Sequence, residues 1–169
     1  MAERRAWQAA VGSLVFLVVV PGTVAGWVPY WLTRWQPRPA FPGFQPLRWV
    51  GWILLVAGVA SLVEAVMRFA LVGLGTPAPV AAPSRLVISG QYRHVRNPMY
   101  VAVVTAVTGQ GLVLGSVALL EYGLVLGLLF HAFVVLYEEP TLGSRFGASY
   151  EAYRRNVRRW WPRATPWVG

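Results

Sequence analysis

The sequence predicts an all-α protein, a polytopic membrane helical bundle of about four transmembrane spans with a C-terminal amphipathic helix. Of the 169 residues, 56% are hydrophobic, a share above that of an ordinary soluble domain. Four apolar stretches approach the length that crosses a hydrocarbon core, about 20 helical residues. The basic residues are concentrated between these stretches. The length suits a single integral membrane domain covering residues 1–169.

The four predicted spans cover residues 7–28, 49–72, 98–114 and 117–137. Only Gly115 and Ser116 separate the last two. A chain that turns back in lipid needs a small, flexible break, so we expect these two spans to form a tight antiparallel hairpin.

The first span also has the outline of a signal peptide. Arg4 and Arg5 precede the apolar run, and small residues surround Ala25. The apolar and aromatic run nevertheless continues past Ala25 to Trp31. A retained span therefore accounts for more residues than a cleaved signal does.

The segments between and after the spans differ in composition. Residues 73–97 contain three prolines and cannot form one continuous helix, so we expect a cytoplasmic loop that contributes to a cofactor site. Residues 144–159 carry aromatic and apolar residues at helical spacing among arginines. This pattern predicts an amphipathic helix that lies on the inner membrane surface or caps the bundle.

The distribution of charged residues along the chain predicts the orientation of the protein in the membrane. The chain has 15 basic residues, all arginine, against 6 acidic residues, all glutamate. With both termini in the cytoplasm, most arginines lie inside, and only Arg34, Arg38 and Arg48 lie outside. This distribution predicts an integral protein of the bacterial inner membrane that contacts anionic lipid head groups, and argues against a nucleic-acid partner. With no Cys, no Asp and 2 His, we expect no disulfide, thiol nucleophile or metal site.

Charged residues inside or beside a membrane are costly and are therefore candidates for function. Glu64 and Arg68 are four residues apart, which favours an ion pair within one helix. The adjacent Glu138 and Glu139 end the last span, where the helix dipole disfavours negative charge. Either an ion pair with Arg93 or Arg96, or a cationic ligand, would compensate them.

Two further groups of residues allow a structural or a functional interpretation. We expect His131 to make an inter-helix hydrogen bond and His94 to lie on a solvated or interfacial loop. The small residues Gly109, Gly111 and Gly115 favour close helix packing, with room for a flat ligand as the alternative.

The second half of the chain carries motifs of a known superfamily. These are Gly90 and Tyr92, then "RNPMY" (96–100), Gly109, "YEEP" (137–140) and the tail "FGASYEAYRRNV" (146–157). In this order they resemble the isoprenylcysteine carboxyl methyltransferase and phospholipid methyltransferase superfamily over about the last hundred residues. "NPMY" and "EEP" are more similar to the phosphatidylethanolamine N-methyltransferase branch, and the tail to the isoprenylcysteine branch. Asn97 stands where the isoprenylcysteine enzymes usually have His.

The resemblance implies S-adenosylmethionine as cofactor and a lipidic or hydrophobic methyl acceptor at the cytoplasmic membrane face. The two carboxylates would then receive the cationic part of the cofactor, arginines its carboxylate, and tyrosines its adenine or ribose. The residues so implied are Gly90, Tyr92, Arg96, Asn97, Tyr100, Glu138 and Glu139.

Methyl transfer by in-line displacement depends on approach geometry more than on an acid or base, so no catalytic residue is assigned. Two rivals stay open: a reductase that uses NADPH, similar to the sterol reductases, and a non-catalytic membrane scaffold. A polyanionic nicotinamide cofactor would favour arginines without the acidic pair.

Overall fold

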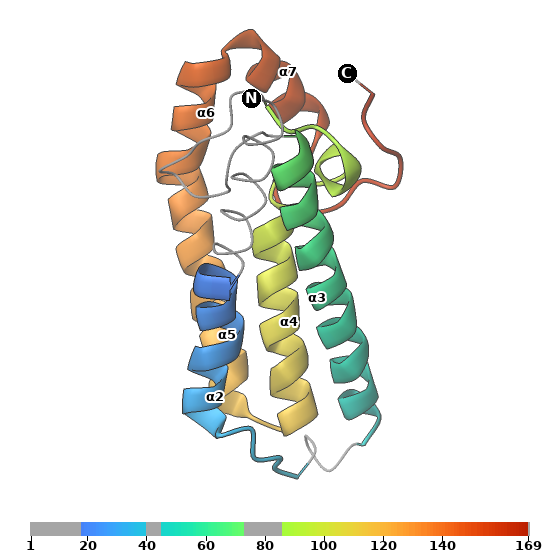
Figure 1. The fold of residues 1–169 in the computed structure, drawn as a ribbon, viewed down its shortest axis with the longest axis vertical. Coiled ribbons are helices and arrows are strands. Elements are labelled where there is room, and N and C mark those ends of the chain that lie inside the picture. Colours follow the sequence, from blue (N-terminus) through green and yellow to red (C-terminus); the bar gives the residue numbers. More distant parts are fainter. Residues whose placement is uncertain (1–17, 40–44, 73–85, 169) are drawn as a thin grey trace, which may run out of the picture.

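The computed structural model describes residues 18–39, 45–72 and 86–168, and this part of the chain is all-helical (Figure 1). Helical residues 18–22 lead into a π-helical turn, η1 (Thr23–Trp27), and α2 (Val28–Thr33). The remaining elements are α3 (Pro46–Val72), η4 (Gly90–Arg93), α4 (Pro98–Leu114), α5 (Val117–Phe133), η5 (Val134–Glu138), α6 (Glu139–Phe146) and α7 (Ala148–Asn156). Helices α3, α4 and α5 run side by side along the bundle. Helix α7 and the C-terminal segment that follows it, residues 157–168, lie at one end of the bundle.

Two predicted spans agree closely with observed helices. Residues 98–114 coincide with α4, and residues 49–72 lie within α3. Gly115 ends α4 with a φ of 63°, and the Ser116 side chain then caps α5 by accepting a hydrogen bond from the Leu119 amide. Of the first predicted span, residues 7–17 lie outside the described residues, and residues 18–28 are helical.

The helix that holds the last predicted span, residues 117–137, does not end at residue 137, because it starts at Val117 and continues to Phe146. A proline normally disrupts a helix, since it has no N–H and its ring clashes with the carbonyl four residues earlier. Here η5 widens the turn before Pro140, and the Glu139 amide bonds the carbonyl of Val134 instead. The proline is thereby accommodated without ending the helix.

The predicted amphipathic helix 144–159 is not one helix either. Gly147, with a φ of 49°, separates α6 from α7, and α7 ends at Asn156. The aromatic stripe of this segment faces the protein: Tyr150, Tyr153 and Val157 are buried against the loop that precedes α4. The segment therefore caps one end of the bundle.

Glycines set the distance between α3 and α4. A Cβ atom on Gly109 would lie 2.5 Å from the Leu55 amide nitrogen and 2.7 Å from the Gly51 carbonyl oxygen. A Cβ on Gly58 would meet the backbone of α4 at 2.7 Å. The packing interpretation of Gly109 is thus confirmed, because any side chain there would force the two backbones apart.

Polar side chains inside the bundle satisfy backbone carbonyls that helix η1 leaves free. Pro29 cannot donate to the Ala25 carbonyl, which instead accepts a 2.7 Å hydrogen bond from Gln110 Nε2. The Val24 carbonyl accepts a 2.9 Å hydrogen bond from the Tyr122 hydroxyl. In an apolar environment such carbonyls would otherwise be costly, so α4 and α5 hold η1 in place.

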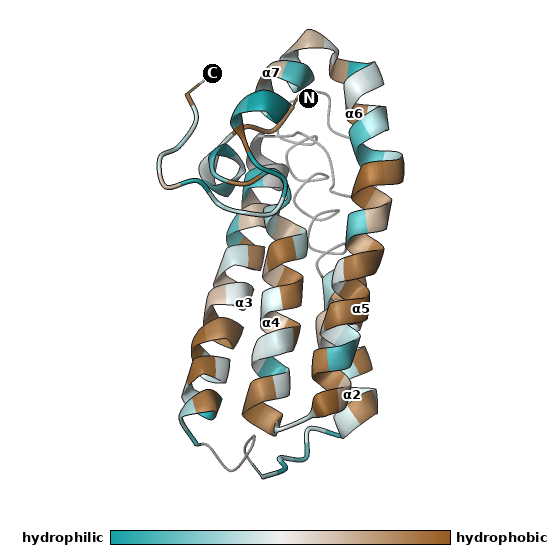
Figure 2. Cartoon of the chain, turned by 180° about the vertical axis from the view of Figure 1, so that it is seen from behind, coloured by the Kyte–Doolittle hydropathy of each residue, from teal (hydrophilic) through white to brown (hydrophobic). Residues whose placement is uncertain are grey.

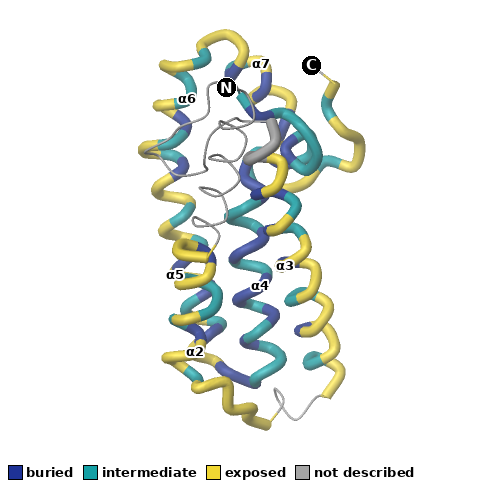
Figure 3. Tube along the Cα trace, in the orientation of Figure 1, coloured by how far each residue is buried: buried dark blue, intermediate teal, exposed yellow. Residues whose placement is uncertain are grey.

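Two helical stretches of the described chain are long and apolar enough to cross a membrane: Pro46–Arg68 and Val117–Phe146. Only 28% and 22% of their apolar windows are buried within the protein. Large hydrophobic side chains such as Ile53, Leu124 and Leu136 are accordingly exposed. Figure 2 shows hydrophobic residues along the bundle and hydrophilic ones at the α7 end, and Figure 3 shows the exposed outer faces.

Candidate functional site

The loop before α4 is fixed to its neighbours at several points. Ser61 of α3 donates a 2.6 Å hydrogen bond to the side-chain oxygen of Gln91. Val95 forms a parallel bridge with Arg158, and the Arg96 amide donates to the Arg158 carbonyl at 2.9 Å. The C-terminal segment therefore holds this loop, which carries Tyr92 and Arg96, at the start of α4.

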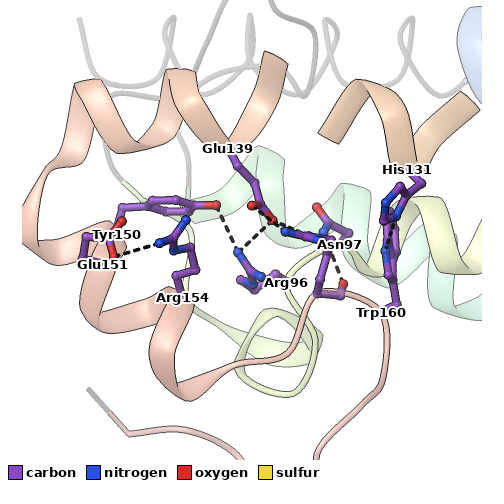
Figure 4. Close-up of polar contacts among 9 residues, drawn as sticks. Arg96, Asn97, His131, Glu139, Tyr150, Glu151, Arg154 and Trp160 are labelled. Atoms are coloured by element: carbon purple, nitrogen blue, oxygen red, sulfur yellow. Dashed lines mark hydrogen bonds and ion pairs between the residues drawn. The ribbon is translucent and has the colours of Figure 1, made fainter. Parts of the chain in front are cut away.

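The adjacent Glu138 and Glu139 point to different partners. Glu139 is buried and lies 2.9 Å from Arg96 Nη1. Arg159 also binds it through two hydrogen bonds, Nε to Oε1 at 2.6 Å and Nη2 to Oε2 at 2.9 Å. Figure 4 shows this arrangement, with Tyr150 accepting a further hydrogen bond from Arg96 at 3.2 Å. The ion pair predicted with Arg96 is thus confirmed for Glu139, and a second arginine joins it.

The contact with Glu139 also stabilises the charged form of Arg159. The hydrogen bond with Glu139 raises the pKa of its guanidinium above the usual value. A bidentate arginine–carboxylate pair fixes orientation as well as charge. The contact therefore connects the C-terminal segment to α6.

Glu138 faces a cavity instead. Its Oε2 accepts a 2.8 Å hydrogen bond from the Tyr100 hydroxyl, and among the described residues no cation forms an ion pair with it. The cavity measures about 100 Å³ and lies between residues 20–24, α3, α4 and the α5–η5 helix. Its polar wall consists of Tyr92, Arg96, Asn97, Tyr100 and Glu138. Its apolar wall includes Met99 and Phe130.

Five of the seven residues that the sequence singled out therefore meet around one cavity. Asn97 is buried there and donates its side-chain N–H to the Arg159 carbonyl at 3.2 Å. Glu139 lies behind the cavity wall, where it binds Arg96. Gly90 is placed elsewhere: its Cα packs against the Glu64 and Arg68 side chains, and a Cβ would collide with Glu64. The expected ion pair of those two residues is confirmed at 2.9 Å.

The cavity wall offers both signs of charge. The carboxylate of Glu138 suits a cation. Arg96 Nε is buried and has no hydrogen-bond partner within the described part of the chain, so it is available to an acceptor on a ligand. Burial raises the pKa of the Tyr92 hydroxyl well above its usual value, so this phenol is neutral. The wall therefore presents an anionic group, an unpaired donor and aromatic rings close together.

Several contributors to the site were not predicted from the sequence. Phe130 lies beside Tyr100, with ring centroids 4.7 Å apart, but in the sequence it is one apolar residue among many on its helix. Arg159 is one of five arginines that follow Gly147, and its spacing did not distinguish it. Trp160 Nε1 donates a 3.0 Å hydrogen bond to His131 Nδ1, so among the described residues the partner of His131 lies in the C-terminal segment. The ring of His94 contacts the Arg163 carbonyl at 2.9 Å on the loop, where we expected it.

Comparison with models of known protein families shows to which family this chain is related. A family model described as phospholipid methyltransferase matches residues 47–149, which include nearly all of α3, then α4, α5 and the polar wall of the cavity.

The chain belongs to the phospholipid methyltransferase family. Comparison with curated proteins and with solved structures gave no match. Membership of this family makes the chain a methyltransferase, and together with the two apolar helices it indicates association with a membrane. No group of three or more potential metal ligands occurs among the described residues.

Proposed function

We propose that this methyltransferase uses S-adenosylmethionine to methylate a lipidic or hydrophobic acceptor at the cytoplasmic face of the membrane. The observation that carries the proposal is the Glu138 carboxylate, which Tyr100 orients at the cavity and which no described cation neutralises. S-adenosylmethionine supplies an electrophilic methyl group on a sulfonium, and it also carries an ammonium and a carboxylate. Glu138 would hold a cationic group, and Arg96 Nε would donate to the carboxylate.

The chain supplies binding and water exclusion rather than acid–base chemistry. Tyr92 and Tyr100 would pack against the adenosine moiety, and Asn97 would keep the start of α4 in place through its bond to the C-terminal segment. Asn97 can donate and accept hydrogen bonds but cannot serve as a base near neutral pH. Methyl displacement depends on alignment and desolvation, which such a wall provides.

The acceptor would reach the cavity from the lipid side. Val20, Val24, Met99 and Phe130 form the apolar part of the cavity lining. A substrate with an apolar chain would gain from burial there, at roughly 25 cal/mol per Å² of apolar surface. The methylated atom would be a nucleophile: a carboxylate oxygen, an amine nitrogen or a thiol sulfur.

The arrangement in the membrane is also part of the proposal. Four spans, the last two forming a hairpin, would place the cavity near the inner surface of a bacterial cytoplasmic membrane, with both termini inside. The described arginines of the loop, α6, α7 and the C-terminal segment support this orientation, because cytoplasmic ends of membrane proteins are rich in basic residues.

Calorimetric titration of the purified protein tests the proposal. We expect S-adenosylmethionine to bind and NADPH to bind weakly or not at all. Glu138→Gln should weaken S-adenosylmethionine binding by about tenfold or more, since it removes the charge and keeps the shape. Tighter binding of NADPH than of S-adenosylmethionine to the parent protein would refute the assignment.

Glu139→Gln is the matched comparison. It removes the same charge one residue away, behind the cavity wall. We expect it to lower the thermal unfolding midpoint more than Glu138→Gln does, because it leaves Arg96 and Arg159 without their carboxylate. Identical binding by the parent and Glu138→Gln would show that the carboxylate does not face the cofactor.

A further inference from the structure

Three arginines, one at the end of α7 and two in the C-terminal segment, surround a second hollow in the protein surface. Arg155, Arg158 and Arg163 line it together with Asn156, Pro162 and residues 164–165. Its volume is about 460 Å³, and it shares no lining residue with the cavity at Glu138. It is therefore a separate feature from the proposed cofactor site.

No carboxylate neutralises these arginines within the described part of the chain. The acidic side chains at this end have other partners: Glu139 binds Arg96 and Arg159, and Glu151 binds Arg154. Arg155 and Arg158 make no described ion pair or side-chain hydrogen bond, and the described side-chain hydrogen bond of Arg163 goes to the Asn156 carbonyl, at 2.9 Å. Three positive charges around one hollow repel each other unless an anion compensates them.

The backbone holds the two sides of the hollow at a fixed separation. On one side, Arg158 forms the parallel bridge with Val95. On the other, the Arg163 amide donates to the His94 carbonyl at 3.0 Å, and the His94 ring contacts the Arg163 carbonyl at 2.9 Å. The guanidinium groups therefore extend from a preorganised frame, which lowers the entropic cost of gathering them around a ligand.

The two tryptophans between Arg158 and Arg163 indicate where this hollow lies relative to the membrane. Trp160 donates a hydrogen bond to His131, which places Trp160 beside the apolar α5 helix (Figure 4). The neighbouring Trp161 is 75% exposed. Indole rings prefer the interface between hydrocarbon and water, where lipid phosphates also lie.

We propose that Arg155, Arg158 and Arg163 form a binding site for the phosphate of an anionic lipid head group. Guanidinium groups bind phosphate oxygens through paired, charge-assisted hydrogen bonds, and several of them around one hollow favour an anion over a zwitterion. The bound lipid would attach the C-terminal segment to the membrane surface beside the cavity without itself being methylated.

Native mass spectrometry of the full chain in neutral detergent tests this. We expect the parent to bind phosphatidylglycerol at least tenfold more tightly than phosphatidylcholine. The triple variant Arg155→Gln, Arg158→Gln, Arg163→Gln should lose that preference. The control, Arg34→Gln, Arg38→Gln, Arg145→Gln, removes the same charge from exposed positions elsewhere and should keep it. Thermal unfolding and S-adenosylmethionine titration establish that both variants are folded.

Three outcomes would overturn the proposal. Equal loss of preference in both triple variants would mean that net charge, and not this hollow, selects anionic lipid. Full displacement of phosphatidylglycerol by inorganic phosphate at the same concentration would mean that the site takes free phosphate and not a lipid. Retained preference in the first triple variant would also refute it.

Discussion

Arg159 binds both oxygens of the Glu139 carboxylate, Nε to Oε1 at 2.6 Å and Nη2 to Oε2 at 2.9 Å. The two residues are 20 positions apart and belong to different elements, the C-terminal segment and α6. The contact closes the end of the bundle over the loop that carries Arg96. The Arg159–Glu139 ion pair therefore helps to fix the position of Arg96 in the cavity wall.

Arg159→Gln should lower the free energy of unfolding by roughly 1–3 kcal/mol, because buried Glu139 loses two charge-assisted hydrogen bonds while Arg96 remains. Thermal unfolding in detergent measures the change. Arg154→Gln is the control, since its pair with Glu151 is about half exposed and contributes roughly 0–1 kcal/mol. Equal midpoints for both variants would contradict the prediction.

Tyr100→Phe should weaken S-adenosylmethionine binding by roughly 1–3 kcal/mol, because Glu138 loses the hydroxyl that orients it in a partly desolvated wall. Titration calorimetry measures the affinity. Tyr137→Phe removes an exposed hydroxyl next to Glu138 in the sequence and should bind like the parent. If Tyr100→Phe bound as tightly as Tyr137→Phe, the hydrogen bond would be structural only.

Gln110→Leu should destabilise the protein by roughly 1–3 kcal/mol, since the Ala25 carbonyl would lose its donor in an apolar environment. Thr105→Val is the control on the same helix, because Thr105 makes no side-chain hydrogen bond among the described residues. Unfolding midpoints in detergent distinguish the two. A stable Gln110→Leu protein would mean that water or lipid reaches this carbonyl.

Gly109→Ala should be destabilising by roughly 1–3 kcal/mol, because the new methyl group meets the α3 backbone at 2.5 Å. Gly127→Ala provides the contrast. Its Cβ would lie 4.0 Å from Val104 Cγ2, an ordinary contact, so the higher helix propensity of alanine should make the change neutral or stabilising. The same loss at both glycines would argue against close packing as the cause at Gly109.

The orientation of the protein in the membrane can be tested by cysteine labelling without background from native thiols, since the chain contains no cysteine. Ser144→Cys and Gln36→Cys place a thiol at exposed positions at opposite ends of the bundle. In intact cells an impermeant maleimide should label position 36 and not position 144. Labelling at position 144 alone would reverse the proposed topology.

The sequence by itself determined the features that depend on local chemistry. Hydrophobic runs defined α3 and α4, because a helix in lipid must satisfy its own backbone over about 20 residues. The motifs at 90–100 and 137–140 indicated the family, and five of their residues meet at one cavity. The Glu64–Arg68 pair followed from spacing on one helix, which is a local rule.

Only the tertiary structure decided what depends on distant segments. The adjacency of Glu138 and Glu139 did not reveal that one binds two arginines while the other faces a cavity, because neighbouring residues on a helix point in different directions. The choice of Arg159 among the tail arginines depends on how the tail returns to α6, which composition does not encode. Likewise, the helix continues past Glu138 and Glu139, where the last span was expected to end, because the widened turn η5 accommodates Pro140. Local sequence predicts elements and motifs, whereas the partner of each buried charge is set by the path of the chain between them.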